Sequence, residues 1–415
     1  MPPPAPPAIG RSSQILAVVL LGIQAALLAK ALAAGDWILD AGGRPLFTDF
    51  STIWVTGLQI RHEPAVAAYD WARHGAWERD WFATEGLPSG WHYAPSLLFL
   101  VWALALLPFP LAFAGWVAST GALYALAVQA IVRHRVAGVL ALAFPAVTWN
   151  AMVGQTGTLT AALIGAALGL LERRPVWAGI ALGCLTYKPQ FGLLFPLALA
   201  AGGHWRAVAA AAATAVGLVA ASALAFGPQT WLAFAANIPA LQSAVLEQNL
   251  NGAHKLQSVF GLLRFLGAAP WVAYAVHAAG LAVVAGSVIA LWRSRAPYDL
   301  KAAWLALATV LATPYAFVYD LPVLAVAIAF MTRFALTRGV APWDVPVVAA
   351  ACLLVQAFPV VRGPSGLAAI LLLAGWVAHR WRAAGKPAVE AHAFEPASAA
   401  AGAGPGQAQG GLARW

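Results

Sequence analysis

The stretch Phe47-Thr-Asp-Phe-Ser-Thr-Ile-Trp-Val-Thr-Gly57 places an acidic residue, Asp49, shortly after the first long apolar run of the chain. It opens a polar segment, residues 36–93, which lies between that run and a much longer apolar remainder. Eight of the 15 acidic residues of the chain fall in this segment. The rest of the sequence therefore reads as an apolar scaffold that holds the segment at a surface.

The composition predicts a membrane protein. The chain is 61% hydrophobic and only 9% charged, whereas a soluble domain carries about 25% charged residues. Repeated apolar runs of about 20 residues are typical of helices that cross a bilayer. The sequence lacks the short alternating segments of a membrane β-barrel. We predict an all-α polytopic membrane protein.

Charge and cysteine content exclude several other classes. The net charge of +9 comes from basic residues that stand singly or in short clusters between apolar runs, a pattern typical of cytoplasmic loops and lipid headgroups and not of nucleic-acid binding. The two cysteines, Cys184 and Cys352, lie inside apolar runs. We therefore expect no disulfide framework, no metal site and no nucleic-acid partner.

The apolar runs predict about twelve crossings. A further run, residues 94–107, is short and ends at Pro108-Phe-Pro110, so we interpret it as re-entrant or interfacial, with a short true crossing as the alternative. The predicted spans are residues 15–34, 111–132, 136–150, 155–171, 176–187, 190–201, 207–226, 271–292, 302–313, 321–336, 345–360 and 367–381.

Charge distribution orients these spans. With the N-terminus inside, 15 of the 24 basic residues lie on the cytoplasmic side, as the positive-inside rule requires. Residues 1–14 and 383–415 are then predicted to be disordered cytoplasmic tails flanking one membrane domain, residues 15–382. The first and second periplasmic loops are predicted at residues 36–93 and 227–270.

Asp49 is the leading catalytic candidate. An outward-facing carboxylate at a membrane surface can act as a general base that removes the proton of an attacking hydroxyl. Its neighbours Phe47 and Phe50 provide an apolar setting, which tends to raise the pKa of a carboxylate. The alternative is that Asp49 caps a helix over residues 50–60.

Lys188 is the second candidate. It separates two apolar segments of about half the length of a crossing, and a lysine at membrane depth usually marks a functional site. The two segments would form a hairpin whose tip reaches the outer leaflet, where a cation can hold a phosphate. The alternative is a lysine that snorkels at a helix end.

Other polar residues on the predicted outer face could bind phosphate or sugar hydroxyls. Asp320 stands at another outer boundary, where we expect it to cap the next helix. The candidate phosphate ligands, besides Lys188, are His254, Lys255 and Arg61, and the candidate substrate ligands are Gln155, Asn249, Asn251, Gln257, His92 and Tyr93.

Four segments resemble glycosyltransferase family 87. They are Thr48-Asp-Phe50 with Gly57, Trp91-His-Tyr-Ala-Pro95, Trp149-Asn-Ala-Met-Val-Gly-Gln155, and Ala178-Gly-Ile-Ala-Leu-Gly183 leading to Lys188-Pro189. The resemblance implies a GT-C fold whose catalytic acidic residue stands in the first outer loop, which corresponds to Asp49. It also implies transfer of a hexose, typically mannose, from a polyprenyl-phosphate donor to a lipid or glycan acceptor, with inversion, at the outer face of the plasma membrane.

Two other functions remain open from the sequence. A secondary transporter would place broken helices at the bilayer midplane, as the segments around Lys188 allow. A lipid-linked polysaccharide polymerase or ligase would use the same lipid carriers but would have its main outer loop late in the chain, whereas here it comes first. We expect no cofactor for the transferase.

Overall fold

The computed structural model describes residues 11–82, 90–134, 136–248 and 252–384. Within these ranges the chain is helical, and its β structure consists of three isolated bridges. Before Lys188 the α-helices are α1 (Arg11–Ala34), α2 (Asp49–His62), α3 (Trp71–Trp81), α4 (Leu98–Leu104), α5 (Phe109–Val132), α6 (Ala137–Leu142), α7 (Pro145–Val153), α8 (Gly157–Leu170) and α9 (Pro175–Gly183). After it come α10 (Phe195–Ala201), α11 (Trp205–Phe226), α12 (Pro228–Gln242), α13 (Val259–Phe265), α14 (Pro270–Arg293), α15 (Tyr298–Leu311), α16 (Pro322–Arg338), α17 (Asp344–Gln356), α18 (Phe358–Val361) and α19 (Ser365–Ala384).

Five helices in the described ranges are long and apolar enough to cross a membrane. They lie in α1, α5, α11, α14 and α16, and their mean hydropathy runs from 1.6 to 2.3. Large apolar side chains on the outer helices face outwards, among them Leu224 of α11 (88% exposed) and Trp271 of α14 (73% exposed). Lipid tails are the solvent in which such surfaces are stable. The chain is consistent with the predicted polytopic membrane protein.

The predicted number of twelve crossings is not confirmed. Several expected spans are short helices, whereas a 30 Å hydrocarbon core needs about 20 residues. The expected span 136–150 is divided between α6 and α7, because Pro145 has no N–H to continue the helix. The helix Pro95–Leu104, inside the expected re-entrant segment, is about 15 Å long and so reaches half of that core.

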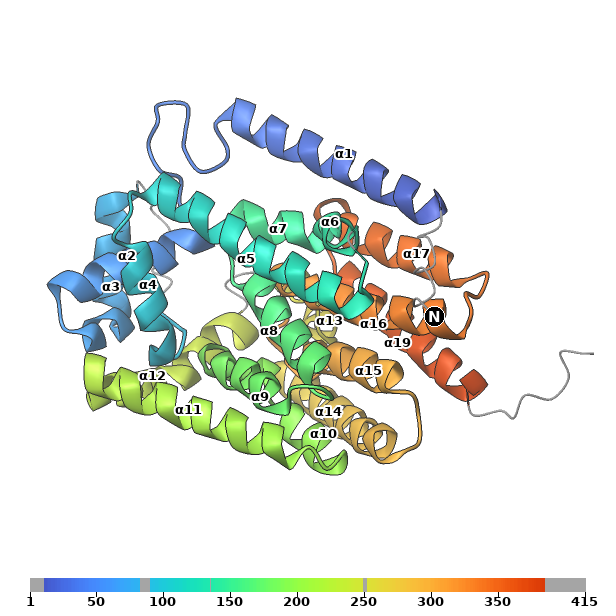
Figure 1. Ribbon diagram of the computed structural model, residues 1–415. Coiled ribbons are helices and arrows are strands. Elements are labelled where there is room, and N and C mark those ends of the chain that lie inside the picture. The colour runs from blue at the N-terminus through green and yellow to red at the C-terminus, as the bar shows by residue number, and fades with distance from the viewer. Residues whose placement is uncertain (1–10, 83–89, 135, 249–251, 385–415) are drawn as a thin grey trace, which may run out of the picture.

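Within the acidic segment 36–93, residues 49–81 form packed helices and not an open loop. Ten consecutive residues of α2, from Phe50 to Gln59, are buried. A Cβ atom on Gly57 would lie 2.1 Å from the carbonyl oxygen of Val101, so α2 lies directly against α4. Figure 1 shows α2, α3 and α4 together at one end of the molecule. This packing fixes the N-terminus of α2, where Asp49 stands.

The second predicted loop, residues 227–270, is also largely helical. It contains α12, the π-helical turn η5 (Ser243–Glu247), the 3-10 turn η6 (Ala253–Lys255) and α13. The side-chain amide of Asn237 donates to the carbonyl oxygen of Tyr69 at 2.5 Å, so α12 is joined to the acidic segment. The two predicted outer segments therefore meet in the fold.

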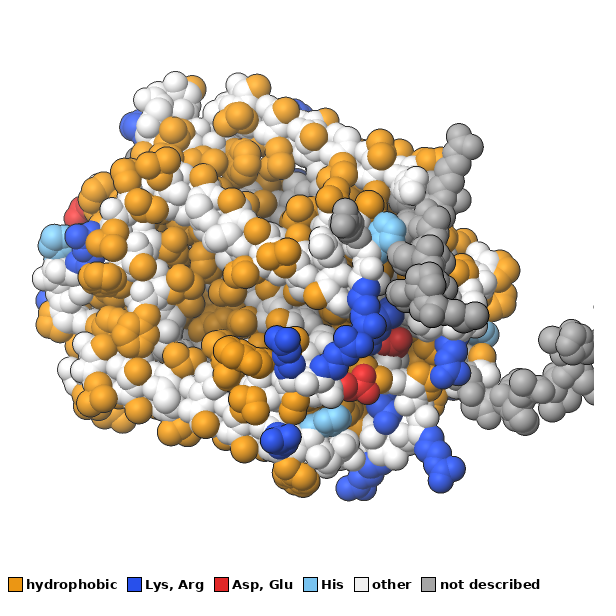
Figure 2. All heavy atoms as spheres, in the orientation of Figure 1, with side chains coloured by type: hydrophobic (Ala, Val, Ile, Leu, Met, Phe, Trp, Pro, Cys, Tyr) orange, Lys and Arg blue, Asp and Glu red, His pale blue; other side chains and the backbone are white. Residues whose placement is uncertain are grey.

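Charged side chains are distributed unevenly over the surface. Figure 2 shows a broad orange apolar face, with most of the visible Lys and Arg side chains gathered on the side where α5 ends and α19 lies. A smaller charged group lies near α2 and α3. An apolar belt between two charged ends is the surface expected of a membrane protein.

Candidate active site

The site is built around the turn that joins α7 to α8, Gly154-Gln-Thr-Gly157. Gly154 has φ +67°, a left-handed conformation that favours glycine. A Cβ atom there would lie 2.6 Å from the Cβ atom of Phe50 and 2.8 Å from the ring of Phe113. The absent side chain therefore lets the start of α2 lie against the turn, which brings Asp49 next to Gln155.

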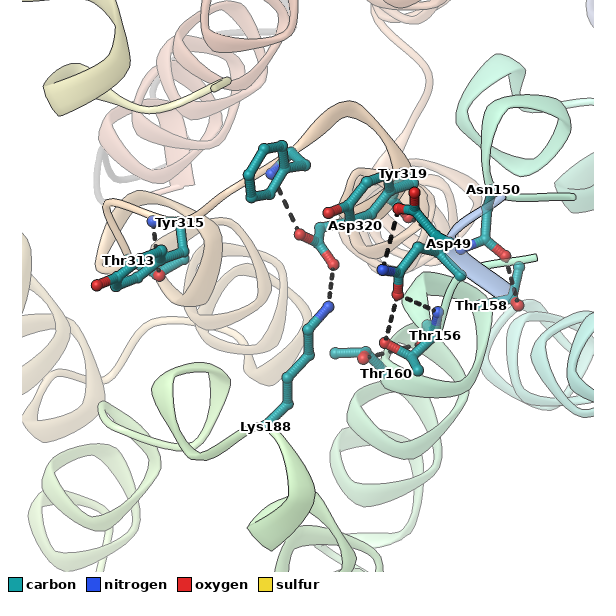
Figure 3. A network of polar contacts seen from close by, with 12 residues as sticks. Asp49, Asn150, Thr156, Thr158, Thr160, Lys188, Thr313, Tyr315, Tyr319 and Asp320 are labelled. Carbon is teal, nitrogen blue, oxygen red and sulfur yellow. Dashed lines mark hydrogen bonds and ion pairs between the residues drawn. The ribbon is translucent and has the colours of Figure 1, made fainter. Parts of the chain in front are cut away.

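The second glycine of the turn draws in another part of the chain. A Cβ atom on Gly157 would lie 1.7 Å from the carbonyl oxygen of Tyr319. The side-chain amide of Asn150 donates to that same oxygen at 3.3 Å. Tyr319 belongs to the 3-10 turn η7 (Val318–Asp320). The turn therefore packs against α2, which carries Asp49, and against η7, which carries Asp320; Figure 3 shows both carboxylates near Thr156.

Asp49 is the first residue of α2, after the N-cap residue Thr48. Its half-buried carboxylate accepts a hydrogen bond from Nε2 of Gln155 at 3.2 Å. Burial raises the pKa of Asp49, while the Gln155 hydrogen bond and the charges of Lys255 and Lys188 oppose that rise. The carboxylate thus contacts the turn, and the charges of the two lysines act on it. The N-cap residue of α2 is Thr48, so the alternative that Asp49 caps this helix does not describe its contact.

Gln155 connects Asp49 to Tyr93. The Tyr93 hydroxyl donates to Oε1 of Gln155 at 2.6 Å, and the backbone N–H of Thr156 donates to the same oxygen at 2.9 Å. Tyr93, Gln155 and Thr156 are all at least 95% buried. Burial raises the pKa of Tyr93, so its phenol remains a proton donor.

Lys188 lies between the 3-10 turns η3 (Cys184–Tyr187) and η4 (Pro189–Phe191), as the sequence placed it between two short apolar segments. Its Nζ atom forms an ion pair with Oδ1 of Asp320 at 2.6 Å, and both side chains are buried. The ammonium also lies 5.3 Å from the ring centroid of Phe191 and 5.7 Å from that of Tyr319. This contact supports a buried, interior lysine over one that snorkels at a helix end.

Asp320 is the partner of Lys188 in the site, whereas the sequence indicated only a helix cap for it. Its Oδ2 accepts from the backbone N–H of Phe317, three residues upstream, at 3.1 Å, so Asp320 caps the 3-10 turn η7 that leads into α16 and not α16 itself, which the sequence predicted it to cap. The other oxygen faces Lys188. An acidic residue at a span boundary was the available signal, but its partner lies 132 positions away in the sequence. Tyr319, Thr156 and Tyr187 are further members of this network that the sequence did not single out.

The second polar segment contributes Lys255. This residue is exposed, and its charge acts on Asp49 across the site. His254 is half-buried and stacks on the ring of Phe358. Gln257 is fully buried, and its amide donates to the His254 carbonyl at 3.0 Å and accepts from the Gly366 N–H at 2.7 Å, so it braces the segment. Asn249 and Asn251 lie outside the described residues.

Arg61 and His92 are two further candidate ligands from the acidic segment 36–93. Arg61 stands twelve positions after Asp49 on α2, about 18 Å along the helix, and donates to the Ala105 carbonyl at 2.8 Å. The structure does not bring it to Asp49. His92 is adjacent to Tyr93, with ring centroids 4.3 Å apart, and burial lowers its pKa to about 4. His92 is therefore neutral at pH 7.

The described residues contain no group of three or more His, Cys, Asp or Glu side chains that could hold a metal ion. The chemistry that this arrangement offers from its own side chains is one half-buried carboxylate, one buried lysine in an ion pair and one exposed lysine. A carboxylate suits proton abstraction, and ammonium groups suit an anionic leaving group.

The fold and this site define an α-helical membrane protein in which a carboxylate–amide contact and a buried ion pair lie between packed helices. The chain belongs to glycosyltransferase family 87, whose family model matches residues 91–314, more than half of the 415 residues. The resemblance noted in the sequence is thereby confirmed. No curated protein and no solved structure matches the chain. The matched range includes Tyr93, Gln155 and Lys188, whereas Asp49 precedes it and Asp320 follows it.

Proposed function

We propose that the protein transfers a hexose, with mannose as the first candidate, from a polyprenyl-phosphate donor to a hydroxyl group of a lipid or glycan acceptor at the outer face of the plasma membrane. The observation that carries the proposal is the half-buried Asp49 carboxylate, which shares one site with two lysines in a member of a glycosyltransferase family. Membership of that family favours transfer over the transporter alternative.

In this proposal Asp49 is the general base. The acceptor hydroxyl gives its proton to the Asp49 carboxylate, and its oxygen forms a bond to the anomeric carbon of the donor. The bond between that carbon and the phosphate oxygen breaks on the opposite side, so polyprenyl phosphate leaves and the configuration inverts. Burial raises the pKa of Asp49, which strengthens it as a base.

Lys188 and Lys255 would bind the donor phosphate. An ammonium group has three N–H donors, and the described contacts of Lys188 include one carboxylate hydrogen bond, to Asp320. The lysine can therefore keep that bond while donating to a phosphate oxygen. Lys255 is exposed and would approach the phosphate from the second polar segment. His254 is next to it, whereas the position of Arg61 removes it from the proposal.

The donor class is tested with purified protein in lipid vesicles. Radiolabelled mannose is supplied either as polyprenyl-phosphate mannose or as a soluble nucleotide sugar, together with a membrane lipid extract as the acceptor. We expect label in product from the lipid-linked donor only, with an anomeric configuration opposite to that of the donor. Transfer from the nucleotide sugar, or retention of configuration, would contradict the proposal.

The sugar is tested in the same system. Polyprenyl-phosphate glucose replaces the mannose donor at equal concentration, and the ratio of kcat/KM values measures the preference. A higher value for mannose supports it as the donor sugar. A higher value for glucose would keep the polyprenyl-phosphate donor class and contradict mannose.

A further inference from the structure

The orientation of the Gln155 amide is fixed by its neighbours. The backbone N–H of Thr156 can only donate, and it lies 2.9 Å from one amide atom of Gln155. That atom must therefore be the oxygen, Oε1. The other amide atom, 3.2 Å from Oδ2 of Asp49, is then the nitrogen, which can only donate. The arrangement leaves a single direction for this hydrogen bond, from Gln155 to Asp49.

Tyr93 favours the same orientation of the Gln155 amide. Its hydroxyl lies 2.6 Å from Oε1 of Gln155 and must donate, because that oxygen only accepts. Tyr93 is 3% exposed and Gln155 is 4% exposed, so water has little access to this hydrogen bond. A flipped amide would set a nitrogen against the Thr156 N–H and an oxygen against the Asp49 carboxylate. Both contacts would be repulsive.

We propose that Gln155 is a positioning residue for the Asp49 carboxylate, held in its working orientation by Tyr93, and that neither side chain is a sugar ligand. The inference rests on the proposed function of Asp49 as general base. The Gln155 N–H occupies one carboxylate oxygen, Oδ2, and leaves Oδ1 to receive the acceptor proton. It also stabilises the ionised carboxylate against its burial.

Three variants separate this role from the alternatives. Gln155→Leu removes the donor, Gln155→Glu replaces the donor with an acceptor of similar shape, and Tyr93→Phe removes only the hydroxyl. Because a hydrogen bond to a charged group is lost, we expect kcat to fall about ten- to hundred-fold in Gln155→Leu. KM for polyprenyl-phosphate mannose should change little. Tyr93→Phe should give a smaller loss in the same direction, since the Thr156 N–H still anchors Oε1.

The pH dependence gives a more specific readout. The Gln155 hydrogen bond lowers the pKa of Asp49 against the larger effect of burial. Its removal should therefore shift the acidic limb of the kcat profile to higher pH. Gln155→Glu should shift that limb further, because a second carboxylate would face Asp49. The charge of the glutamate would shift the limb whatever role Gln155 has, so Gln155→Leu is the decisive variant: if the glutamine only fills space, leucine should leave the limb at its wild-type pH.

A double variant tests whether Tyr93 acts on Asp49 through the Gln155 amide. If Tyr93 acts only through the amide, Tyr93→Phe should have no further effect on kcat in a Gln155→Leu background. An equal loss from Tyr93→Phe in both backgrounds would show that Tyr93 acts directly on substrate. A rise in KM at constant kcat in Gln155→Leu would show that Gln155 binds sugar. Either result would overturn the inference.

A measurement without substrate decides the inference independently of the proposed function. Infrared difference spectra of the purified protein follow the carboxylic acid C=O band of Asp49 with pH, and its absence in Asp49→Asn assigns the band. We expect the midpoint to move to higher pH in Gln155→Leu and, by less, in Tyr93→Phe. Identical midpoints in folded wild type and both variants would overturn the positioning role. Failure of wild type to transfer from any polyprenyl-phosphate sugar would instead contradict the proposed function.

Discussion

At the scale of single residues, Asp49 differs from the other acidic residues of its segment in its surroundings. Asp40 accepts hydrogen bonds from Gly42 and Arg44 at the surface, and Asp70 caps α3. Asp49 instead accepts a hydrogen bond from a buried amide, and the charges of two lysines from distant parts of the chain act on it. This combination, and not the acidic residue alone, is what suits it to proton abstraction.

The first prediction concerns the pH dependence of transfer. Burial raises the pKa of Asp49, and a base must be deprotonated to act. Activity should therefore be present above the raised pKa and fall as the pH drops through it. The measurement is kcat/KM for the lipid-linked donor as a function of pH. The limb should lie clearly above pH 3.9, the ordinary aspartate pKa, and a limb at or below that pH would contradict the argument.

The second prediction concerns the ion pair between Lys188 and Asp320. Removal of one partner leaves the other charge buried and uncompensated, which costs about 3–5 kcal/mol. Lys188→Met and Asp320→Asn should each lower the melting temperature, followed by tryptophan fluorescence of the purified protein. The double variant should lose less stability than the sum of the two single variants. Without Lys188 it should still fail to transfer sugar. Additive losses would show that the pair does not act as a unit.

At the scale of elements, the turn between α7 and α8 determines the geometry of the site. Its two glycines have no side chain, so α2 packs against Gly154 and η7 packs against Gly157 at distances that a Cβ atom would prevent. The residues that touch across these approaches are far apart in sequence, 106 positions for Gln155 and Asp49. Packing against this turn therefore positions both carboxylates of the site, those of Asp49 and Asp320.

Gly154→Ala tests this element. The new Cβ atom would meet Phe50 at 2.6 Å in a left-handed conformation, so we expect a loss of about 1–3 kcal/mol and reduced transfer. Gly115→Ala in α5 is the matched control, because its Cβ atom would have no neighbour within 4 Å. Thermal unfolding and transfer rates of both variants are compared with wild type. Equal effects of the two changes would count against the role of the turn.

The sequence predicted the long elements well and the site only in part. The apolar runs predicted α1, α5, α11 and α14 closely, because length and hydropathy alone determine such helices. Polar residues near boundaries drew attention to Asp49, Lys188 and Gln155. The partner relationships could not be read from one sequence, since they depend on which distant segments pack together. Asp320 was missed as a partner of Lys188 for that reason.

At the scale of the whole molecule, the two polar segments meet on the side of α2 and α3, and most basic side chains lie elsewhere. The side-chain contact of Asn237 with the Tyr69 carbonyl joins the segments. The basic residues at the ends of α5, α14 and α16 include Arg133, Arg293 and Arg338. By the positive-inside rule we predict that this end lies in the cytoplasm and that the proposed site lies on the outer face.

Labelling of single cysteines tests this orientation. Cys184 and Cys352 are first replaced by alanine, and Lys255→Cys or Arg174→Cys is then introduced at an exposed position. In spheroplasts a membrane-impermeant maleimide should label the cysteine at 255, and it should reach position 174 only after permeabilisation. The opposite pattern would place the site in the cytoplasm and contradict the proposed donor geometry.

The most direct test of the central claim is the transfer rate of Asp49→Asn relative to wild type, with polyprenyl-phosphate mannose as the donor. Asp36→Asn is the matched control, since it makes the same change at an exposed position of the same segment. Loss of the general base predicts that Asp49→Asn falls about 10²–10⁴-fold at normal abundance while Asp36→Asn retains activity. Transfer by Asp49→Asn at the wild-type rate would contradict the assignment of Asp49 as the catalytic base.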